Sequence, residues 1–196
     1  MSRPVDNVRV RRTRKLLRDA LIELIEERGF DRLTVGEICE RAMVSRAAFY
    51  RNYRDKFQLV EQIFDEAVGT LLGTIADDGL QSPLERWVGF FEHIEEYHRL
   101  YGALLGRSGS PWFANKMRAT LADMVTEHLP PPDPRATAPS TGLVPTVLSA
   151  MFVQSITWWL EHDRPSPPRQ IATQSAQLAS AVIAQANKWN GTPTQA

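Results

Sequence analysis

The sequence predicts an all-α protein with an N-terminal three-helix helix-turn-helix domain followed by a C-terminal helical bundle domain. Two observations carry this prediction: a pair of short, capped helical segments within residues 34–56, and apolar residues at helical spacing in every longer segment. We expect residues 8–56 to form the first domain, called the head, and residues 78–190 the second, called the body. A linking helix over about residues 56–77 joins them.

The two short helices of the head are delimited by capping signals. Thr34 followed three residues later by Glu37 is a capping box, in which side chain and backbone satisfy each other's hydrogen bonds. Ser45 is a second N-cap, and Asp55 a third one that begins the linking helix. Met43 lies in the turn between the short helices. Helix, tight turn and helix is the helix-turn-helix plan.

In that plan the second helix enters the major groove of DNA. Arg46 is a candidate for reading guanine, and Ala47 and Ala48 are small enough to approach thymine methyl groups. The donors of Thr34, Tyr50, Arg51, Asn52 and Lys56 are expected to contact phosphates. The predicted DNA-binding set is Thr34, Ser45, Arg46, Ala47, Ala48, Tyr50, Arg51, Asn52 and Lys56.

The segment from about Arg11 to Phe64 resembles the DNA-binding domain of the TetR family of transcriptional regulators. The resemblance rests on Leu33-Thr34-Val35, Ile38, Ala42, Val44-Ser45, Phe49-Tyr50, Asn52-Tyr53, Asp55-Lys56 and Leu59. Three positions depart from the family pattern: Met43 replaces a Gly, Asn52 a His and Tyr53 a Phe. The resemblance implies a homodimer that binds a double-stranded DNA operator, and a body that holds an effector.

The charge distribution agrees with a DNA-binding head. Net charge is zero, but residues 1–60 hold 14 Lys+Arg against 9 Asp+Glu, and the remainder holds 9 against 14. A basic N-terminal third beside an acidic remainder is typical of a protein that presents one end to DNA. Arg9, Arg11, Arg12, Arg14, Lys15 and Arg18 either cover a solvated helix face or contact DNA beside the motif.

Composition also bears on the compartment. Cys39 is the single cysteine, which excludes an intramolecular disulfide and favours a core residue over a redox sensor. We expect a cytoplasmic protein with no membrane span, because the uncharged run 136–160 contains Pro139, Pro145 and several polar residues.

Helices and breakers alternate along the rest of the chain. We expect residues 1–7 to be a disordered arm, and the first helix to end at Gly29. Asp78-Gly79 marks the boundary of the body. There the predicted helices begin at Pro83, Trp112, Leu143 and Gln170. They are separated by a glycine-rich passage over residues 102–112, a proline-rich loop over 130–141 and a break at 165–168.

The last helix suggests a dimer face. It carries no charge from Gln170 to Asn187, and its small residues recur at three- and four-residue spacing. It is either buried within its own subunit or shared across a two-fold axis with the helix around Met151 to Trp159. The predicted dimer residues are Met151, Ser155, Trp159, Ser175, Ala179, Val182 and Ile183.

The body is rich in aromatic and Met side chains, which fill a core and also suit an apolar cavity. We expect a repressor that binds a palindromic operator as a dimer and releases it when an apolar or aromatic small-molecule effector occupies the body. The candidate ligand-binding residues are Trp87, Phe91, Tyr101, Trp112, Met117 and Phe152.

Two alternatives compete with a sequence-specific regulator. Glu92, His93, Glu95, Glu96 and His98 could hold a metal in a helical-bundle metal-dependent enzyme, but a di-metal bundle site needs a second E-x-x-H motif that the sequence lacks. We therefore expect no catalytic residue, metal or cofactor. A protein that coats DNA without sequence preference is the other alternative, and the capped second helix argues against it.

Overall fold

The computed structural model describes residues 4–77, 82–106, 109–128 and 140–189, all in helices, turns and short loops. The helices of this part of the chain are α1 (Pro4–Arg28), α2 (Val35–Arg41), α3 (Arg46–Tyr50), α4 (Lys56–Asp77), α5 (Pro83–Glu96), α6 (His98–Leu105), α7 (Pro111–His128), α8 (Ser140–Glu161) and α9 (Pro168–Trp189). The predicted boundary at Asp78-Gly79, the core of the proline-rich loop and the tail from Asn190 lie outside the described residues.

The capping residues that delimit α2 and α3 behave as predicted. The Thr34 hydroxyl accepts from the Glu37 amide at 3.3 Å, and the Thr34 amide donates to the Glu37 carboxylate at 2.8 Å. The Ser45 hydroxyl accepts from the Ala48 amide at 3.2 Å, and an Asp55 carboxylate oxygen accepts from the Gln58 amide at 2.8 Å. These local hydrogen bonds fix where each helix of the head begins.

The turn between α2 and α3 is built on a left-handed residue. Met43 has φ 52°, its amide donates to the Glu40 carbonyl at 3.1 Å, and the Val44 amide donates to the Cys39 carbonyl at 2.9 Å. This pair of bonds is a Schellman helix end, in which Gly is preferred at the position that Met43 occupies. Gly29 has φ 76° at the end of α1, as its predicted role requires.

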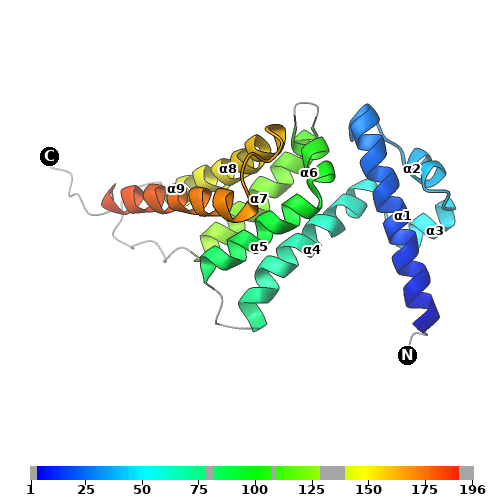
Figure 1. Cartoon of the computed structure of the whole chain (residues 1–196), viewed down its shortest axis with the longest axis horizontal. Coiled ribbons are helices and arrows are strands. Elements are labelled where there is room, and N and C mark those ends of the chain that lie inside the picture. The colour runs from blue at the N-terminus through cyan, green and yellow to red at the C-terminus, as the bar shows by residue number, and fades with distance from the viewer. Residues whose placement is uncertain (1–3, 78–81, 107–108, 129–139, 190–196) are drawn as a thin grey trace.

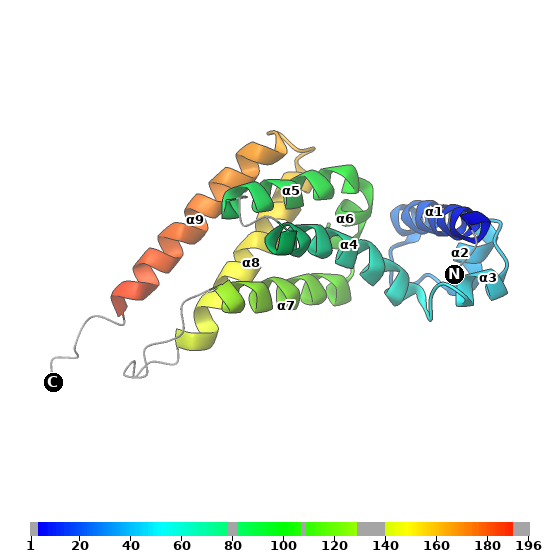
Figure 2. The ribbon, with the colours of Figure 1, turned by 90° about the horizontal axis from the view of Figure 1, so that it is seen from below.

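The long helix α4 leads from the head into the body (Figures 1 and 2). In the body α5 packs against α4 and α9, and α8 packs against α7 and α9. The C-terminal end of α9 points away from the head in both views. Contacts between α1 and α6 join the head to the body directly.

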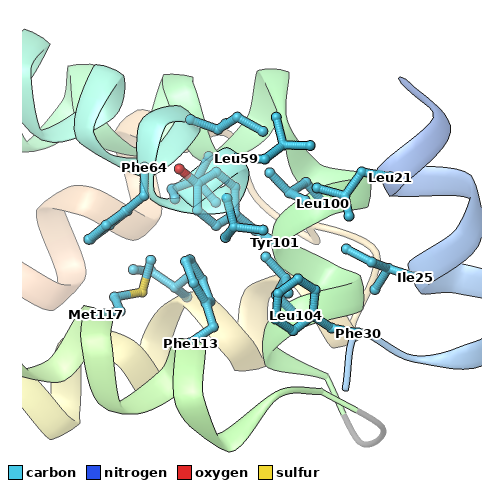
Figure 3. Close-up of a cluster of buried hydrophobic side chains, with 14 of the residues drawn as sticks. Leu21, Ile25, Phe30, Leu59, Phe64, Leu100, Tyr101, Leu104, Phe113 and Met117 are labelled. Carbon is cyan, nitrogen blue, oxygen red and sulfur yellow. The ribbon is translucent and has the colours of Figure 1, made fainter. Parts of the chain in front are cut away.

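The hydrophobic core is continuous across that junction (Figure 3). Leu21 and Ile25 of α1 point toward Leu100 and Leu104 of α6, and Phe30 from the loop after α1 reaches the same cluster. Burying these side chains together resists independent motion of head and body, because separating the two would expose apolar area to water. The division into two domains at residue 78 stays a prediction.

Helices α7, α8 and α9 begin one to three residues before their predicted starts, at Pro111, Ser140 and Pro168, so the end of the predicted proline-rich loop is helical. Two other segments also differ from expectation. Helix α1 begins at Pro4, so residues 4–7 are helical and the prediction of a disordered arm over residues 1–7 is wrong for them. The glycine-rich passage is shorter than predicted, because Gly102 lies inside α6, where a Cβ atom would meet nothing within 4 Å. Helix propensity disfavours Gly by about 1 kcal/mol, but the burial of Leu100, Tyr101 and Leu104 on one side of α6 outweighs it.

By length and composition alone, Gly142–Glu161 of α8 is apolar enough to cross a membrane. Core helices of globular proteins can have the same length and apolar composition. Helix α8 packs against α6, α7 and α9. Ile156 and Trp159 are fully buried in that packing.

Candidate nucleic-acid interface

Helix α3 presents a core side and a solvent side. Phe49 is fully buried, and its ring meets Tyr50 and Tyr53 at centroid distances of 5.4 and 5.6 Å. Arg46 and Arg51 are exposed on the solvent side, and 59% of Tyr50 is accessible. The buried Phe49 therefore fixes which way the exposed side chains of this short helix point.

Of the residues predicted to face bases, Arg46 and Ala47 are exposed and Ala48 is half-buried. The Arg46 guanidinium lies against α2: a Cβ atom placed on Gly36 would come within 2.6 Å of its Nη2 atom. A side chain at position 36 would therefore displace the end of the flexible Arg46 side chain from this position. The sequence pattern did not identify Gly36.

The phosphate-contact candidates at the ends of α2 and α3 differ in how far their side chains already form hydrogen bonds within the protein. Thr34 is exposed, but its hydroxyl donates to Glu37 at 2.7 Å within the capping box. Asn52 is half-buried: its amide nitrogen donates to the Ala48 carbonyl at 2.8 Å, and its oxygen accepts from Nε of Arg14 at 3.4 Å. The Asn52 side chain thus connects the end of α3 to α1.

The predicted phosphate contact of Lys56 needs correction. Lys56 is 9% exposed, and its Nζ donates to the carbonyls of Phe30, Asp31 and Leu33 at 2.9, 3.0 and 2.8 Å. The ammonium also lies 4.7 Å from the centre of the Phe30 ring. Burial lowers the pKa of Lys56, and the Asp31 carboxylate opposes that effect. With three acceptors already engaged, this ammonium has no donor left for a phosphate, so Lys56 is a structural residue.

The basic side chains of α1 are divided between solvent and the body. Arg9, Arg12 and Lys15 are exposed. Arg18 instead donates to the Tyr97 hydroxyl at 2.7 Å, with its guanidinium carbon 5.0 Å from the ring centre. Among these basic residues of α1, Arg18 therefore connects the head to the body.

The predicted effector residues belong to one hydrophobic cluster but are spread over helices α5 to α8. Trp87 of α5 stacks on Phe90 and meets Phe152 at 4.5 Å, and its Nε1 donates to Ser175 Oγ at 2.9 Å. Phe91, Tyr101 and Met117 are fully buried in the core. Trp112, at the start of α7, contacts the rings of Phe30 and Phe57 instead. Trp112 therefore belongs to the junction between head and body.

The predicted dimer residues lie partly inside the subunit. Trp159 is fully buried and its Nε1 donates to the Ser166 carbonyl at 2.8 Å, while Ser175 is 1% exposed. Ala179 is also buried, and Met151, Ser155, Val182 and Ile183 are half-buried. Assigning Trp159 and Ser175 to a dimer face was wrong, because the stripe that carries them packs within its own subunit.

The exposed apolar residues of α8 and α9 lie on other stripes. Accessible fractions are 50% for Leu143, 41% for Val147, 44% for Trp158 and 56% for Leu178. Residues 143, 147 and 158 recur at helical spacing along α8.

The residues considered for a metal site have other roles. His98 Nδ1 lies 2.9 Å from the Glu95 carbonyl, and the His93 ring meets Tyr97 at 4.6 Å. Among the side chains that the structure describes, no group of three or more His, Cys, Asp or Glu could hold a metal ion. Cys39 is buried in the head, where burial raises the pKa of its thiol.

Sequence comparisons place both parts of the chain in one family. Residues 17–63 match the family model of bacterial regulatory proteins, tetR family, and residues 81–181 match that of a transcriptional regulator C-terminal region. Two curated relatives from Bacillus subtilis (strain 168) match over the head. The uncharacterized HTH-type transcriptional regulator YxbF is 36% identical over 50 residues, 26% of this chain and 13% of that protein. The uncharacterized HTH-type transcriptional regulator YvkB is 37% identical over 57 residues, 29% of this chain and 30% of that protein. The matched stretch thus spans less than a third of either relative.

Solved structures share the fold over most of the chain. A TetR transcriptional regulator from Streptococcus agalactiae 2603V aligns with TM-score 0.61 at 20% identity, over 89% of this chain and 97% of that one. The dihydroxyacetone kinase operon activator DhaS aligns with TM-score 0.56 at 14% identity, over 89% of this chain and 96% of that one. The all-α fold with an N-terminal helix-turn-helix domain is thereby confirmed, and an enzyme is excluded because the family is not enzymatic. The chain belongs to the TetR family of helix-turn-helix transcriptional regulators.

Proposed function

We propose that this regulator binds a palindromic operator as a homodimer and reads each half-site with α3. The observation that carries the proposal is the solvent side of α3, where Arg46 and Arg51 flank Ala47 on a helix held by Phe49 and the Ser45 cap. Arg46 is the base reader, and Arg51 and Tyr50 contact phosphates. Ala47 and Ala48 lie closest to the base edges, and Thr34 and Asn52 are auxiliary contacts at the helix ends.

Binding of duplexes selected from a random library tests this proposal. Purified protein at near-physiological salt is expected to enrich a palindrome whose half-sites lie about 34–36 Å apart, one helical turn. Enrichment of no sequence by folded, dimeric protein would contradict sequence-specific reading. It would revive the alternative of a protein that coats DNA without preference.

We propose that the dimer forms through the exposed apolar faces of α8 and α9. Leu143, Val147, Trp158 and Leu178 expose large apolar side chains, which a monomer would leave in water. Half-buried Met151, Val182 and Ile183 are further candidates for the same interface. One short recognition helix reads few base pairs, so DNA binding also requires two heads.

Leu178→Glu places a charge in that interface and is expected to yield monomers with weakened operator binding. Ala119→Glu, an exposed position on α7, is the matched control and should remain dimeric. Sedimentation velocity distinguishes the two variants, and a dimeric Leu178→Glu protein would contradict this interface.

We propose further that an apolar or aromatic small molecule binds in the body and releases the protein from DNA. The aromatic set around Trp87, Phe91 and Phe152 supports this proposal, because adaptable apolar side chains accept such ligands. A ligand lowers operator affinity only by binding more tightly to a form with differently placed heads. Release of labelled operator in a compound screen tests it.

A reporter gene beside the operator distinguishes a repressor from an activator. Binding to chromosomal DNA implies a cytoplasmic protein.

A further inference from the structure

The loop between α1 and α2 is enclosed by side chains from two helices that are distant in sequence. Phe30 in this loop is 1% exposed. The Trp112 ring, from the first turn of α7, stacks on Phe30 with centroids 5.6 Å apart and planes at 17°. Phe57, from the first turn of α4, meets Phe30 at 5.3 Å and Trp112 at 4.8 Å, both edge to face. These three rings form one cluster, which we call the aromatic junction.

Polar contacts hold the same loop from both sides. Lys56 donates to the carbonyls of Phe30, Asp31 and Leu33 from the start of α4. Ser110, which precedes α7 and is 2% exposed, donates its hydroxyl to the Asp31 carboxylate at 2.9 Å. One residue of the body thus bonds directly to the loop that Lys56 holds.

The loop also sets the position of the recognition unit. Leu33 is its last residue, and the next residue, Thr34, is the N-cap of α2. Helix α2 contacts α3, and the Cys39 carbonyl accepts the Val44 amide at the turn between them. Because α2, the turn and α3 are short and tightly bonded, they are expected to follow the loop as a unit.

We propose that Trp112 is a positioning residue for DNA reading, through which α7 of the body fixes the orientation of α2 and α3. The proposal rests on the function proposed above and adds a route from the body to the reading helix that passes through the aromatic junction. Loss of the Trp112 contact leaves the loop held by Lys56, Ser110 and Phe57 alone, which widens the range of α3 orientations. Recognition of bases requires one orientation, whereas attraction to phosphates tolerates many.

Trp112→Ala in the full-length protein tests this role, with Trp112→Phe as the conservative variant. Trp112 is only half-buried, so the Ala variant is expected to fold. Phe90→Leu is the matched control: Phe90 is 1% exposed in α5 and stacks on Trp87, so its loss disturbs the body without touching the loop.

The first readout is the ratio of affinities for the selected operator and for a scrambled duplex. Trp112→Ala is expected to lower operator affinity about tenfold while affinity for the scrambled duplex stays within about twofold. Trp112→Phe should recover most of that loss, and Phe90→Leu should leave the ratio unchanged. An unchanged affinity ratio in folded Trp112→Ala protein would overturn the proposal. An equally large fall of the affinity ratio in Phe90→Leu would overturn it too.

The second readout needs no DNA. Amide hydrogen exchange over residues 29–44 should be faster in Trp112→Ala than in wild type and Phe90→Leu. Unchanged exchange there would contradict the positioning role. If library selection yields no operator, the proposed function fails on that result alone, and exchange still decides whether Trp112 orders the loop.

Discussion

Two sides of the head hold positive charge in opposite ways: the solvent side of α3, which we call the front, and the side of the loop between α1 and α2, which we call the back. On the front, Arg46 and Arg51 of α3 and its C-cap are exposed to solvent. On the back, Lys56 is almost fully enclosed and donates to three backbone carbonyls. Both kinds of cation come from the same short segment of a basic head. Their difference shows that a cation near a recognition helix is a DNA contact only if its donors are not already used by the fold.

Lys56 is enclosed because the loop between α1 and α2 presents backbone carbonyls that need donors. The carbonyls of Phe30, Asp31 and Leu33 belong to a loop without regular secondary structure, so they have no helical partners. A buried ammonium satisfies them, and the adjoining Phe30 and Phe57 rings lie 4.7 and 5.3 Å from it. Arg51 follows α3 on the solvent side, where its side chain is exposed.

The largest expected effect comes from removing the enclosed cation. Lys56→Met keeps the apolar stem but removes the side-chain donor of three carbonyls, of which, in the described part of the chain, only that of Phe30 keeps a backbone donor, the Leu33 amide at 3.1 Å. This should cost about 2–4 kcal/mol in the free energy of unfolding. Urea unfolding measures it. Lys15→Met removes an exposed lysine of α1 and should change stability by less than about 0.5 kcal/mol. Equal stability of the two variants would contradict the structural role of Lys56.

A smaller effect, on specificity alone, is expected for the front. Arg46→Ala should lose about 1–3 kcal/mol of discrimination at one base pair of each half-site, because Arg46 is the only base reader proposed to bond bidentately. The free energy of unfolding should stay within about 0.5 kcal/mol of wild type, since Arg46 is exposed. Competition binding with single-base operator variants measures the discrimination. An intact preference at every base pair would remove Arg46 from the reading role.

The smallest effect is expected for the capping box that Thr34 and Glu37 form at the start of α2. Hydrogen bonds from the Thr34 hydroxyl and backbone lower the pKa of Glu37 below its ordinary value of 4.5. A carboxyl group with a lowered pKa in the folded state stabilises the fold above its unfolded pKa. That contribution is lost as pH falls through the lowered value. Glu37→Gln keeps a residue that the capping box accepts but removes the charge.

We therefore expect Glu37→Gln to be slightly less stable than wild type at pH 7, with the gap closing below pH 4.5. Chemical unfolding of both proteins across this range measures it. A gap that persists at the acid end would show that the charge of Glu37 is not its source.

Local features of the head could be predicted from sequence because their partners lie within a few residues. The Thr34–Glu37 box, the Ser45 cap and the left-handed Gly29 each satisfy a backbone group three or four residues away. Lys56 could not be assigned this way. Its acceptors lie 23 to 26 residues earlier, and only the folded loop brings them together.

The body shows the same limit. The small residues of α9 predict close helix packing, but they do not tell which neighbour is packed. Ser175 packs inside the subunit, where Oγ accepts from Trp87, while Leu178 on another side of α9 is 56% exposed. Gly102 and Gly106 suggested a loop, and α6 forms because its apolar side chains are buried against α1 and α7. Each error concerns a partner distant in sequence.

The salt dependence of operator binding tests the contrast between front and back most directly. The slope of log K against log salt concentration counts the phosphates that a protein neutralises. Arg51→Met is expected to reduce the magnitude of this slope by about one unit, and Lys56→Met to leave it unchanged in the folded protein. A slope that falls for Lys56→Met and stays constant for Arg51→Met would show that the enclosed cation reaches DNA, and would contradict the structural role assigned to Lys56.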